Sequence, residues 1–176
     1  MREVSDQFLL LMAEVSGTLI GLFLVGVFFY VETGLRHLDP ALREVFGSYL
    51  RAGTRIVLLL FALPLGLSLT LVVLGPVWNR VFFLLLSLML VAANVETVLR
   101  LRALGQVIGW TVFQVNEIVG SVAVVVLVVL PWALGGFHPS REDLTWAILL
   151  SFGTGFLSIS ALVLSIFDAA AHETAT

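Results

Sequence analysis

Residues 8–31 read FLLLMAEVSGTLIGLFLVGVFFYV, and Glu14 is the only charged side chain in this stretch. A helix of about 20 apolar residues crosses the hydrocarbon core of a bilayer. The run is long for a secretory signal, only Arg2 is basic before it, and no A-x-A cleavage pattern follows it. We therefore expect residues 8–31 to remain in the protein as a first membrane-spanning helix.

The composition of the whole chain favours the same environment. Of its 176 residues, 60% are hydrophobic and 12% are charged, and the mean hydropathy is +1.10. Soluble domains carry about 25% charged residues, and a globule of this size cannot bury so much apolar surface. The sequence therefore predicts an all-α, polytopic membrane protein whose main partner is the lipid bilayer.

Four further apolar stretches follow the first within what we expect to be one transmembrane domain over residues 1–176. Gly75-Pro76 separates the second stretch from the third, and Gly135–Pro139 separates the fourth from the fifth. Ser140 is expected to cap the start of the fifth helix, because its hydroxyl can accept from free backbone N–H groups there. The five expected spans are residues 8–31, 54–75, 77–99, 108–134 and 144–167.

The segment before the second span begins with Asp39-Pro40, a helix start signal. Apolar residues then recur every three or four positions up to Tyr49. We expect a short interfacial helix over residues 40–50. The alternative is a second span that projects beyond the membrane, and Gly47 and Gly53 leave both open.

The distribution of arginines predicts the orientation. Five spans place the termini on opposite sides, with three arginines on the N-terminal side, Arg2, Arg80 and Arg141. Cytoplasmic loops are enriched in basic residues, so we expect an outside N-terminus and a cytoplasmic C-terminus. Trp78, Trp132 and Trp146 then form an aromatic belt at the outer boundary. The expected cytoplasmic side holds six arginines, Arg36, Arg43, Arg51, Arg55, Arg100 and Arg102.

Several residue types needed for catalysis or cofactor binding are missing. The chain has no cysteine or lysine, and its three histidines lie in polar connections or the tail. A disulfide, a lysine Schiff base and an axial haem ligand at membrane depth are therefore excluded. Gly153-Thr154-Gly155 is not a G-x-S-x-G nucleophile motif. We expect no cofactor and no enzyme activity, and the net charge of −3 gives no reason to expect nucleic acid.

Polar residues within the first span are candidates for function, because an ionisable group at membrane depth costs roughly 2.5–3.5 kcal/mol. Glu14 and Thr18 lie one turn apart, beside the small residues Ala13, Gly17 and Gly21. One interpretation is a packing seam in which Glu14 is protonated or hydrogen-bonded to a neighbour. The other is a carboxylate that lines an outer vestibule or ion site.

A second set of candidates lies on the third and fourth spans. An antiparallel turn near residues 105–106 would place Asn94 level with Glu117 and Glu96 level with Asn116. One interpretation is a polar clamp of interhelical hydrogen bonds, worth about 0.6 kcal/mol each. The other is a cation or proton site of two carboxylates and two amides.

Two local features accompany this set. Arg100 lies one turn after Glu96, in the favourable direction for an i,i+4 ion pair. Pro64 should kink the second span and free a backbone carbonyl, which is tolerated when a neighbour satisfies that carbonyl. The kink is interpreted as a static bend, with a hinge as the alternative.

The fifth span carries a seam of small and polar residues at heptad spacing. One interpretation is close packing inside the subunit. The other is a central axis shared by several subunits, where the hydroxyls line a narrow path and carboxylates form a ring that attracts cations. The candidates are Ser151, Thr154, Ser158, Ser165 and Asp168.

The stretch Gly17–Val25, GTLIGLFLV, followed by Arg51-Ala52 at the second span, resembles a group of small bacterial multi-pass integral membrane proteins. The resemblance covers about the first hundred residues. It implies a polytopic bacterial membrane protein, and it implies no activity and no site residues.

The favoured hypothesis is a homo-oligomeric, cation-preferring ion channel or permeation protein in the inner membrane. One 176-residue bundle is too thin for a wide pore, so several subunits would surround it. Inorganic cations would then be its permeating partners. The alternative is a non-catalytic scaffold or regulator that binds a partner protein and whose basic loop is attracted to anionic lipids. A lipid-directed membrane enzyme is the least favoured.

Overall fold

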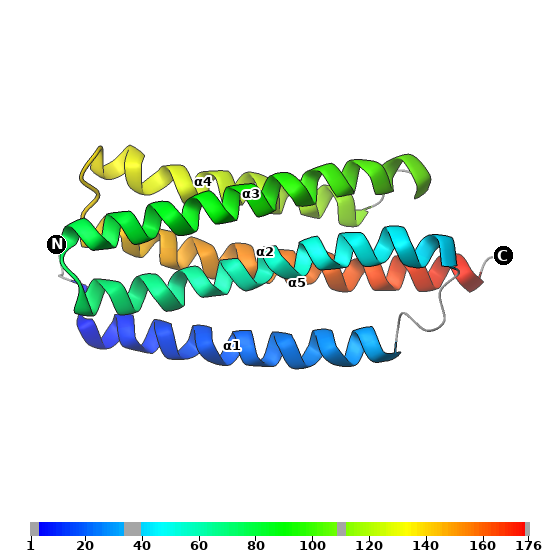
Figure 1. The fold of residues 1–176 in the computed structure, drawn as a ribbon, viewed down its shortest axis with the longest axis horizontal. Helices are drawn as coiled ribbons and strands as arrows, with labels where there is room; N and C mark the ends of the chain where they lie inside the picture. Colours follow the sequence, from blue (N-terminus) through cyan, green and yellow to red (C-terminus); the bar gives the residue numbers. More distant parts are fainter. Residues whose placement is uncertain (1–3, 34–39, 109–111, 175–176) are drawn as a thin grey trace.

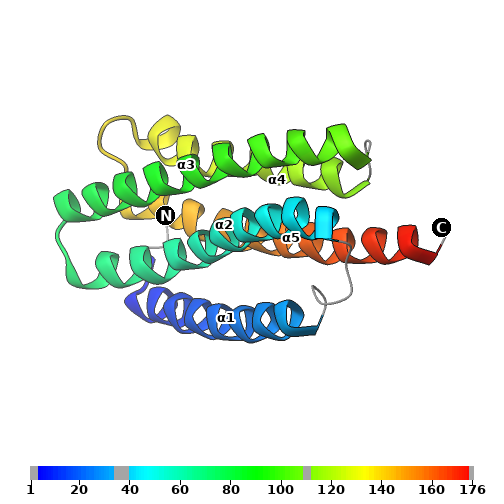
Figure 2. The same ribbon diagram turned by 45° about the vertical axis from the view of Figure 1, so that its right-hand side comes forward.

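The computed structural model describes the backbone of residues 4–33, 40–108 and 112–174, and the side chains of residues 4–29, 47, 51–100, 102 and 118–160. The described chain folds into five long α-helices that run up and down one bundle (Figures 1 and 2). These helices are α1 (Asp6–Thr33), α2 (Pro40–Val73), α3 (Pro76–Ile108), α4 (Val112–Gly135) and α5 (Arg141–Thr174).

Each of the five helices contains a stretch long and apolar enough to cross a membrane. Many large apolar side chains also point outward, among them Phe28 at 70% and Leu22 at 64% exposure. Lipid tails solvate such side chains, whereas water does not. The expectation of an all-α, multi-pass membrane protein is therefore confirmed. The spanning stretches are Asp6–Phe29, Arg51–Val73, Pro76–Arg100, Ile118–Gly135 and Arg141–Ser160.

The expected interfacial helix over residues 40–50 is not a separate element. Pro40–Val73 is one continuous helix, so the second span projects beyond its apolar part, as the alternative proposed. Gly47 and Gly53 do not interrupt it, because glycine keeps its backbone N–H and costs only about 1 kcal/mol relative to alanine inside a helix. Arg51 also donates from Nε to the Gly47 carbonyl at 3.2 Å, which adds a bond along this turn.

Several helices begin or end at the glycine, proline and serine residues that were expected to interrupt or cap them. α2 and α3 meet at Gly75-Pro76, and α4 ends at Gly135, followed by Gly136 with a φ of 59°. A left-handed residue of this kind closes a helix C-terminus, and glycine adopts it without strain. Ser140 caps α5 as expected, since its hydroxyl accepts from the Asp143 N–H at 3.2 Å while the Asp143 carboxylate accepts from the Ser140 N–H at 2.8 Å.

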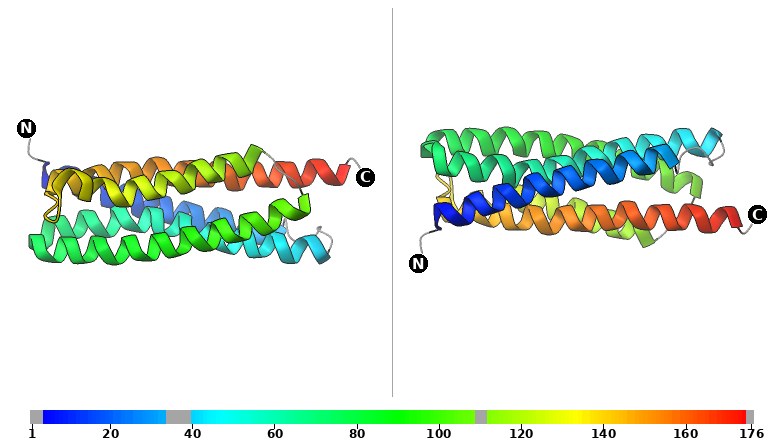
Figure 3. Two further views of the ribbon diagram at one scale, coloured as in Figure 1. Left: turned by 90° about the horizontal axis from the view of Figure 1, so that it is seen from above. Right: turned by 90° about the horizontal axis from the view of Figure 1, so that it is seen from below.

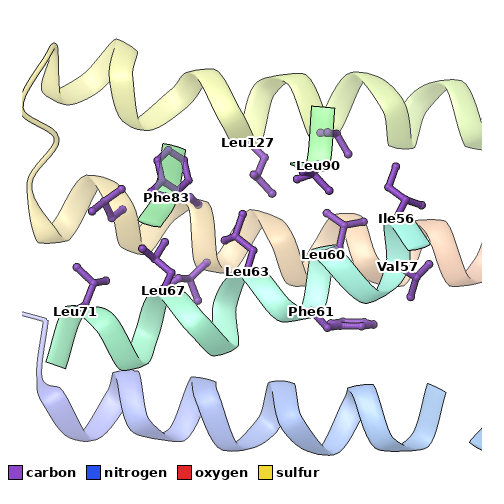
Figure 4. Close-up of a cluster of buried hydrophobic side chains, with 14 of the residues drawn as sticks. Ile56, Val57, Leu60, Phe61, Leu63, Leu67, Leu71, Phe83, Leu90 and Leu127 are labelled. Atoms are coloured by element: carbon purple, nitrogen blue, oxygen red, sulfur yellow. The ribbon is translucent and has the colours of Figure 1, made fainter. Parts of the chain in front are cut away.

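α2 lies at the centre of the bundle, where it packs against α1, α3 and α5, while α4 packs against α5 and α3. Figure 4 shows the apolar core gathered along α2. Six α2 side chains belong to this core and are at most 2% exposed: Ile56, Val57, Leu60, Phe61, Leu63 and Leu67.

The two ends of the bundle differ in the chain segments they carry (Figures 1 and 3). The N-terminus, the α2–α3 turn and the α4–α5 connection lie at one end, which we name the N-end. The C-terminus lies at the opposite end, which we name the C-end. The described arginines of α2 and the end of α3 lie toward the C-end, whereas Arg80 and Arg141 lie toward the N-end.

Candidate functional site

The described part of the α5 seam lies inside the subunit. Ser151, Thr154 and Ser158 are only 0%, 3% and 5% exposed. Ser151 donates its hydroxyl hydrogen to the backbone carbonyl of Leu60 in α2. Pro64, four residues after Leu60, has no N–H to give this carbonyl, so Ser151 supplies the bond that the helix lacks. The expectation that a neighbouring helix satisfies the carbonyl freed by Pro64 is confirmed.

The next two residues of the seam also serve packing. Thr154 donates to the Leu150 carbonyl in its own helix at 2.8 Å. Ser158 faces Gly120 of α4, where an added Cβ atom would lie 3.7 Å from the serine oxygen. This half of the seam therefore supports the interpretation of close packing against α2 and α4. The side chains of Ser165 and Asp168 lie outside the described residues.

The α3–α4 pair brings Asn94 to α4 in a different register from the expected one. Asn94 is buried, and its Nδ2 donates to the Ser121 carbonyl at 3.3 Å. Ser121 lies one turn beyond Glu117, because α3 continues to Ile108, past the expected turn. Asn94 Oδ1 and Ser121 Oγ are buried and have no hydrogen-bond partner among the described residues. The side chains of Asn116 and Glu117 lie outside that part of the structure.

Glu96 joins two helices through two arginines. Its Oε1 accepts from Arg100 Nε at 3.2 Å and Nη2 at 3.1 Å, which confirms the expected i,i+4 pair. Its Oε2 accepts from Arg55 Nη1 at 3.1 Å, a contact that the sequence reasoning missed. The sequence could have predicted this contact, because Arg55 and Glu96 lie equally far along the chain from the tight turn at Gly75-Pro76. Residues equally far from a tight turn lie level with each other on two antiparallel helices.

Glu14 and Thr18 lie on the side of α1 that faces away from α2. Both are exposed, whereas Ser16, between them in sequence, is fully buried. Thr18 donates its hydroxyl hydrogen to the Glu14 carbonyl at 3.0 Å, while no described residue bonds to the Glu14 carboxylate. Glu14 lies eight residues into α1, which corresponds to about 12 Å along the helix axis. A carboxylate is thus exposed within a spanning stretch.

The small residues beside Glu14 divide between two faces of α1. Ala13 is buried at 5% exposure, and an added Cβ at Gly17 would lie 3.9 Å from Leu65 of α2. At Gly21 an added Cβ would meet no atom within 4 Å. Ala13 and Gly17 therefore lie on the side of α1 that approaches α2, whereas Gly21 lies beside open space.

Within the described residues, no three His, Cys, Asp or Glu side chains gather closely enough to hold a metal ion. Comparisons with protein-family models, curated proteins and solved structures each find no match for this chain.

Proposed function

We propose that this chain is a homo-oligomeric, cation-preferring permeation protein of the inner membrane, in which copies of α1 surround a shared axis. Glu14 and Thr18 line that axis, with the N-terminus outside and the C-terminus in the cytoplasm. The observation that carries the proposal is the exposed Glu14 carboxylate in a spanning helix.

The energetics of a bilayer make that placement informative. A carboxylate in contact with acyl chains costs roughly 2.5–3.5 kcal/mol on insertion scales. This cost is avoided when the same face meets water or protein. Copies of the subunit around an axis put several Glu14 carboxylates at one depth, and a ring of carboxylates attracts cations.

The remainder of the exposed face suits a narrow path. The Thr18 hydroxyl donates its hydrogen to the Glu14 carbonyl, and its oxygen retains lone pairs that can accept from water or contact a cation. Val25 and Phe28 continue the same side of the helix at 55% and 70% exposure. Apolar side chains of this kind form constrictions that exclude water until the path widens.

The geometry favours α1 over α5 as the lining helix. Ser151 of α5 already bonds to α2, and Ser158 faces α4, within the same subunit. Moving them to a shared axis would leave the Leu60 carbonyl buried without a donor, which costs about 1–3 kcal/mol. Glu14 needs no such rearrangement, because its face is open.

Flux through reconstituted liposomes tests the proposal. We expect the wild-type protein to pass K⁺ in preference to Cl⁻, and Glu14→Gln to lower that preference about tenfold, since it removes the attracting charge. Glu14→Asp keeps the charge and should retain most of the preference. Glu142→Gln, in the first turn of α5, is the matched control and should leave flux unchanged. Wild-type flux equal to that of protein-free liposomes, across pH and voltage, overturns the proposal.

Cross-linking provides a second readout, because the chain contains no cysteine of its own. Gly21→Cys should give cross-linked homo-oligomers in membranes, whereas Ser16→Cys, on the buried side of α1, should not. Co-purification of a different membrane protein in fixed ratio, without Gly21→Cys cross-links between copies, would favour the scaffold instead.

A further inference from the structure

The C-end of the α2–α3 hairpin gathers positive charge. Arg51 and Arg55 lie one turn apart on α2, and Arg100 and Arg102 lie near the end of α3. Arg55 and Arg100 share the Glu96 carboxylate, although their side chains are 65% and 44% exposed. Among the described residues, Glu96 is the one acidic side chain paired with these arginines. The cluster is therefore positive on balance.

Arg51 and Arg100 keep N–H donors for an external acceptor, because Arg100 uses only its Nε and Nη2 atoms on Glu96. The hairpin register that sets Arg55 against Glu96 also brings Arg51 level with Arg100. Arg51 is exposed and uses its Nε on the Gly47 carbonyl, and no described residue bonds to its Nη atoms. Neighbouring guanidiniums with free N–H groups fit a phosphate, which accepts charge-assisted hydrogen bonds from several donors.

The surface beside the arginines is apolar and exposed. Leu85 and Met89 follow each other along the side of α3 that carries Glu96 and Arg100, and each is 56% exposed. At helical spacing the same side continues through Ala92 and Glu96 to Arg100, which is also exposed. An apolar strip inside a span that leads to basic side chains at its end matches a molecule with acyl chains and a phosphate.

We propose that this surface, defined by Arg51, Arg100 and the strip Leu85–Met89, binds the phosphate and one acyl chain of an anionic phospholipid. Glu96 holds Arg55 and Arg100 in place, and Arg51 and the Nη1 atom of Arg100 are left to meet the headgroup. The site is independent of any path along α1, because it lies on the α2–α3 hairpin. A free phosphate lacks the chain that the strip would contact.

Native mass spectrometry of the purified protein tests this site. The protein is incubated with phosphatidylglycerol, with phosphatidylcholine of the same acyl chains, or with inorganic phosphate. We expect retained phosphatidylglycerol, less phosphatidylcholine and no retained phosphate. Because each arginine near an anionic headgroup changes affinity about fivefold, Arg51→Gln/Arg100→Gln should lower phosphatidylglycerol binding roughly 25-fold.

Two controls keep the outcome interpretable. Arg51→Lys/Arg100→Lys preserves the charge and should retain intermediate binding, which separates headgroup attraction from damage to the fold. Arg80→Gln, toward the N-end, removes an arginine that contacts His138 at 2.7 Å and should bind phosphatidylglycerol as the wild type does. Equal binding of the two lipids, or unchanged binding by Arg51→Gln/Arg100→Gln, overturns the proposal.

Discussion

Pro64 interrupts the hydrogen-bond ladder of α2, since proline has no backbone N–H to donate to the carbonyl four residues earlier. In the hydrocarbon core of a membrane, no water is present to donate a hydrogen bond to an unsatisfied backbone carbonyl. Ser151 from α5 supplies the missing donor, and both its side chain and Leu60 are fully buried. A single hydroxyl therefore joins α5 to the central helix at the point where α2 lacks its own bond.

This arrangement predicts a loss of stability on Ser151→Ala. The Leu60 carbonyl would remain buried without a donor, so the free energy of unfolding should fall by about 1–2 kcal/mol. Denaturation with SDS in mixed micelles measures it. Ser160→Ala is the matched control, because this exposed serine donates only to the Phe156 carbonyl of its own helix.

A double variant isolates the cause. Pro64→Ala restores an N–H that can reach the Leu60 carbonyl, so adding Ser151→Ala to it should cost less than Ser151→Ala alone. If the cost is the same in both backgrounds, the bond to Leu60 is not what Ser151 contributes.

At the scale of helix pairs, the approach of α5 to α2 depends on Gly155. A methyl group added there would lie 2.9 Å from the Cε1 and Cζ atoms of Phe61. Phe61 is fully buried, and its ring centroid lies 6.0 Å from that of Phe156 and 6.2 Å from that of Phe152. The ring therefore has little room to move away from a new side chain.

We expect Gly155→Ala to destabilise the protein by about 1–2 kcal/mol. Overpacking costs about 1–3 kcal/mol, and the better helix propensity of alanine offsets up to about 1 kcal/mol of it. Gly153→Ala adds the same methyl group two residues earlier, at an exposed position where no atom lies within 4 Å. It should be neutral or slightly stabilising in the same SDS titration. Equal effects of the two substitutions would contradict the role of the Phe61 contact.

At the scale of the whole molecule, five helices put the two termini at opposite ends of the bundle (Figure 1). Phe137, in the α4–α5 connection at the N-end, is 91% exposed, while Arg102 lies toward the C-end. Since the chain has no cysteine, single cysteines at these two positions report the sides of the membrane without interference.

Labelling of intact cells with a membrane-impermeant maleimide measures the orientation. We expect Phe137→Cys to react from outside and Arg102→Cys to react only after permeabilisation, because the arginine-rich side stays in the cytoplasm. The reverse pattern would invert the proposed orientation. Labelling of both cysteines from outside would show that α4, the helix between them, does not cross the membrane as the bundle suggests.

The sequence alone determined the five apolar helices and, to within three residues, their boundaries at the N-end. Lipid contains no water for backbone groups, so a long apolar run must form a helix that satisfies its own backbone. The break at Gly75-Pro76, the helix cap at Ser140 and the Glu96–Arg100 ion pair each involve residues within one or two helical turns of each other. All of these follow from neighbours in the chain, which is why they were readable from it.

The tertiary structure alone decided which side of each helix points inward. Lipid tails and neighbouring helices solvate an apolar side chain almost equally well, so apolar spacing does not mark the interior of a membrane bundle. The burial of Ser151 against Leu60 and the outward placement of Glu14 therefore appeared only when the helices were assembled. The same holds for the Arg55–Glu96 contact and the register of Asn94, because each depends on how two helices slide and rotate against each other.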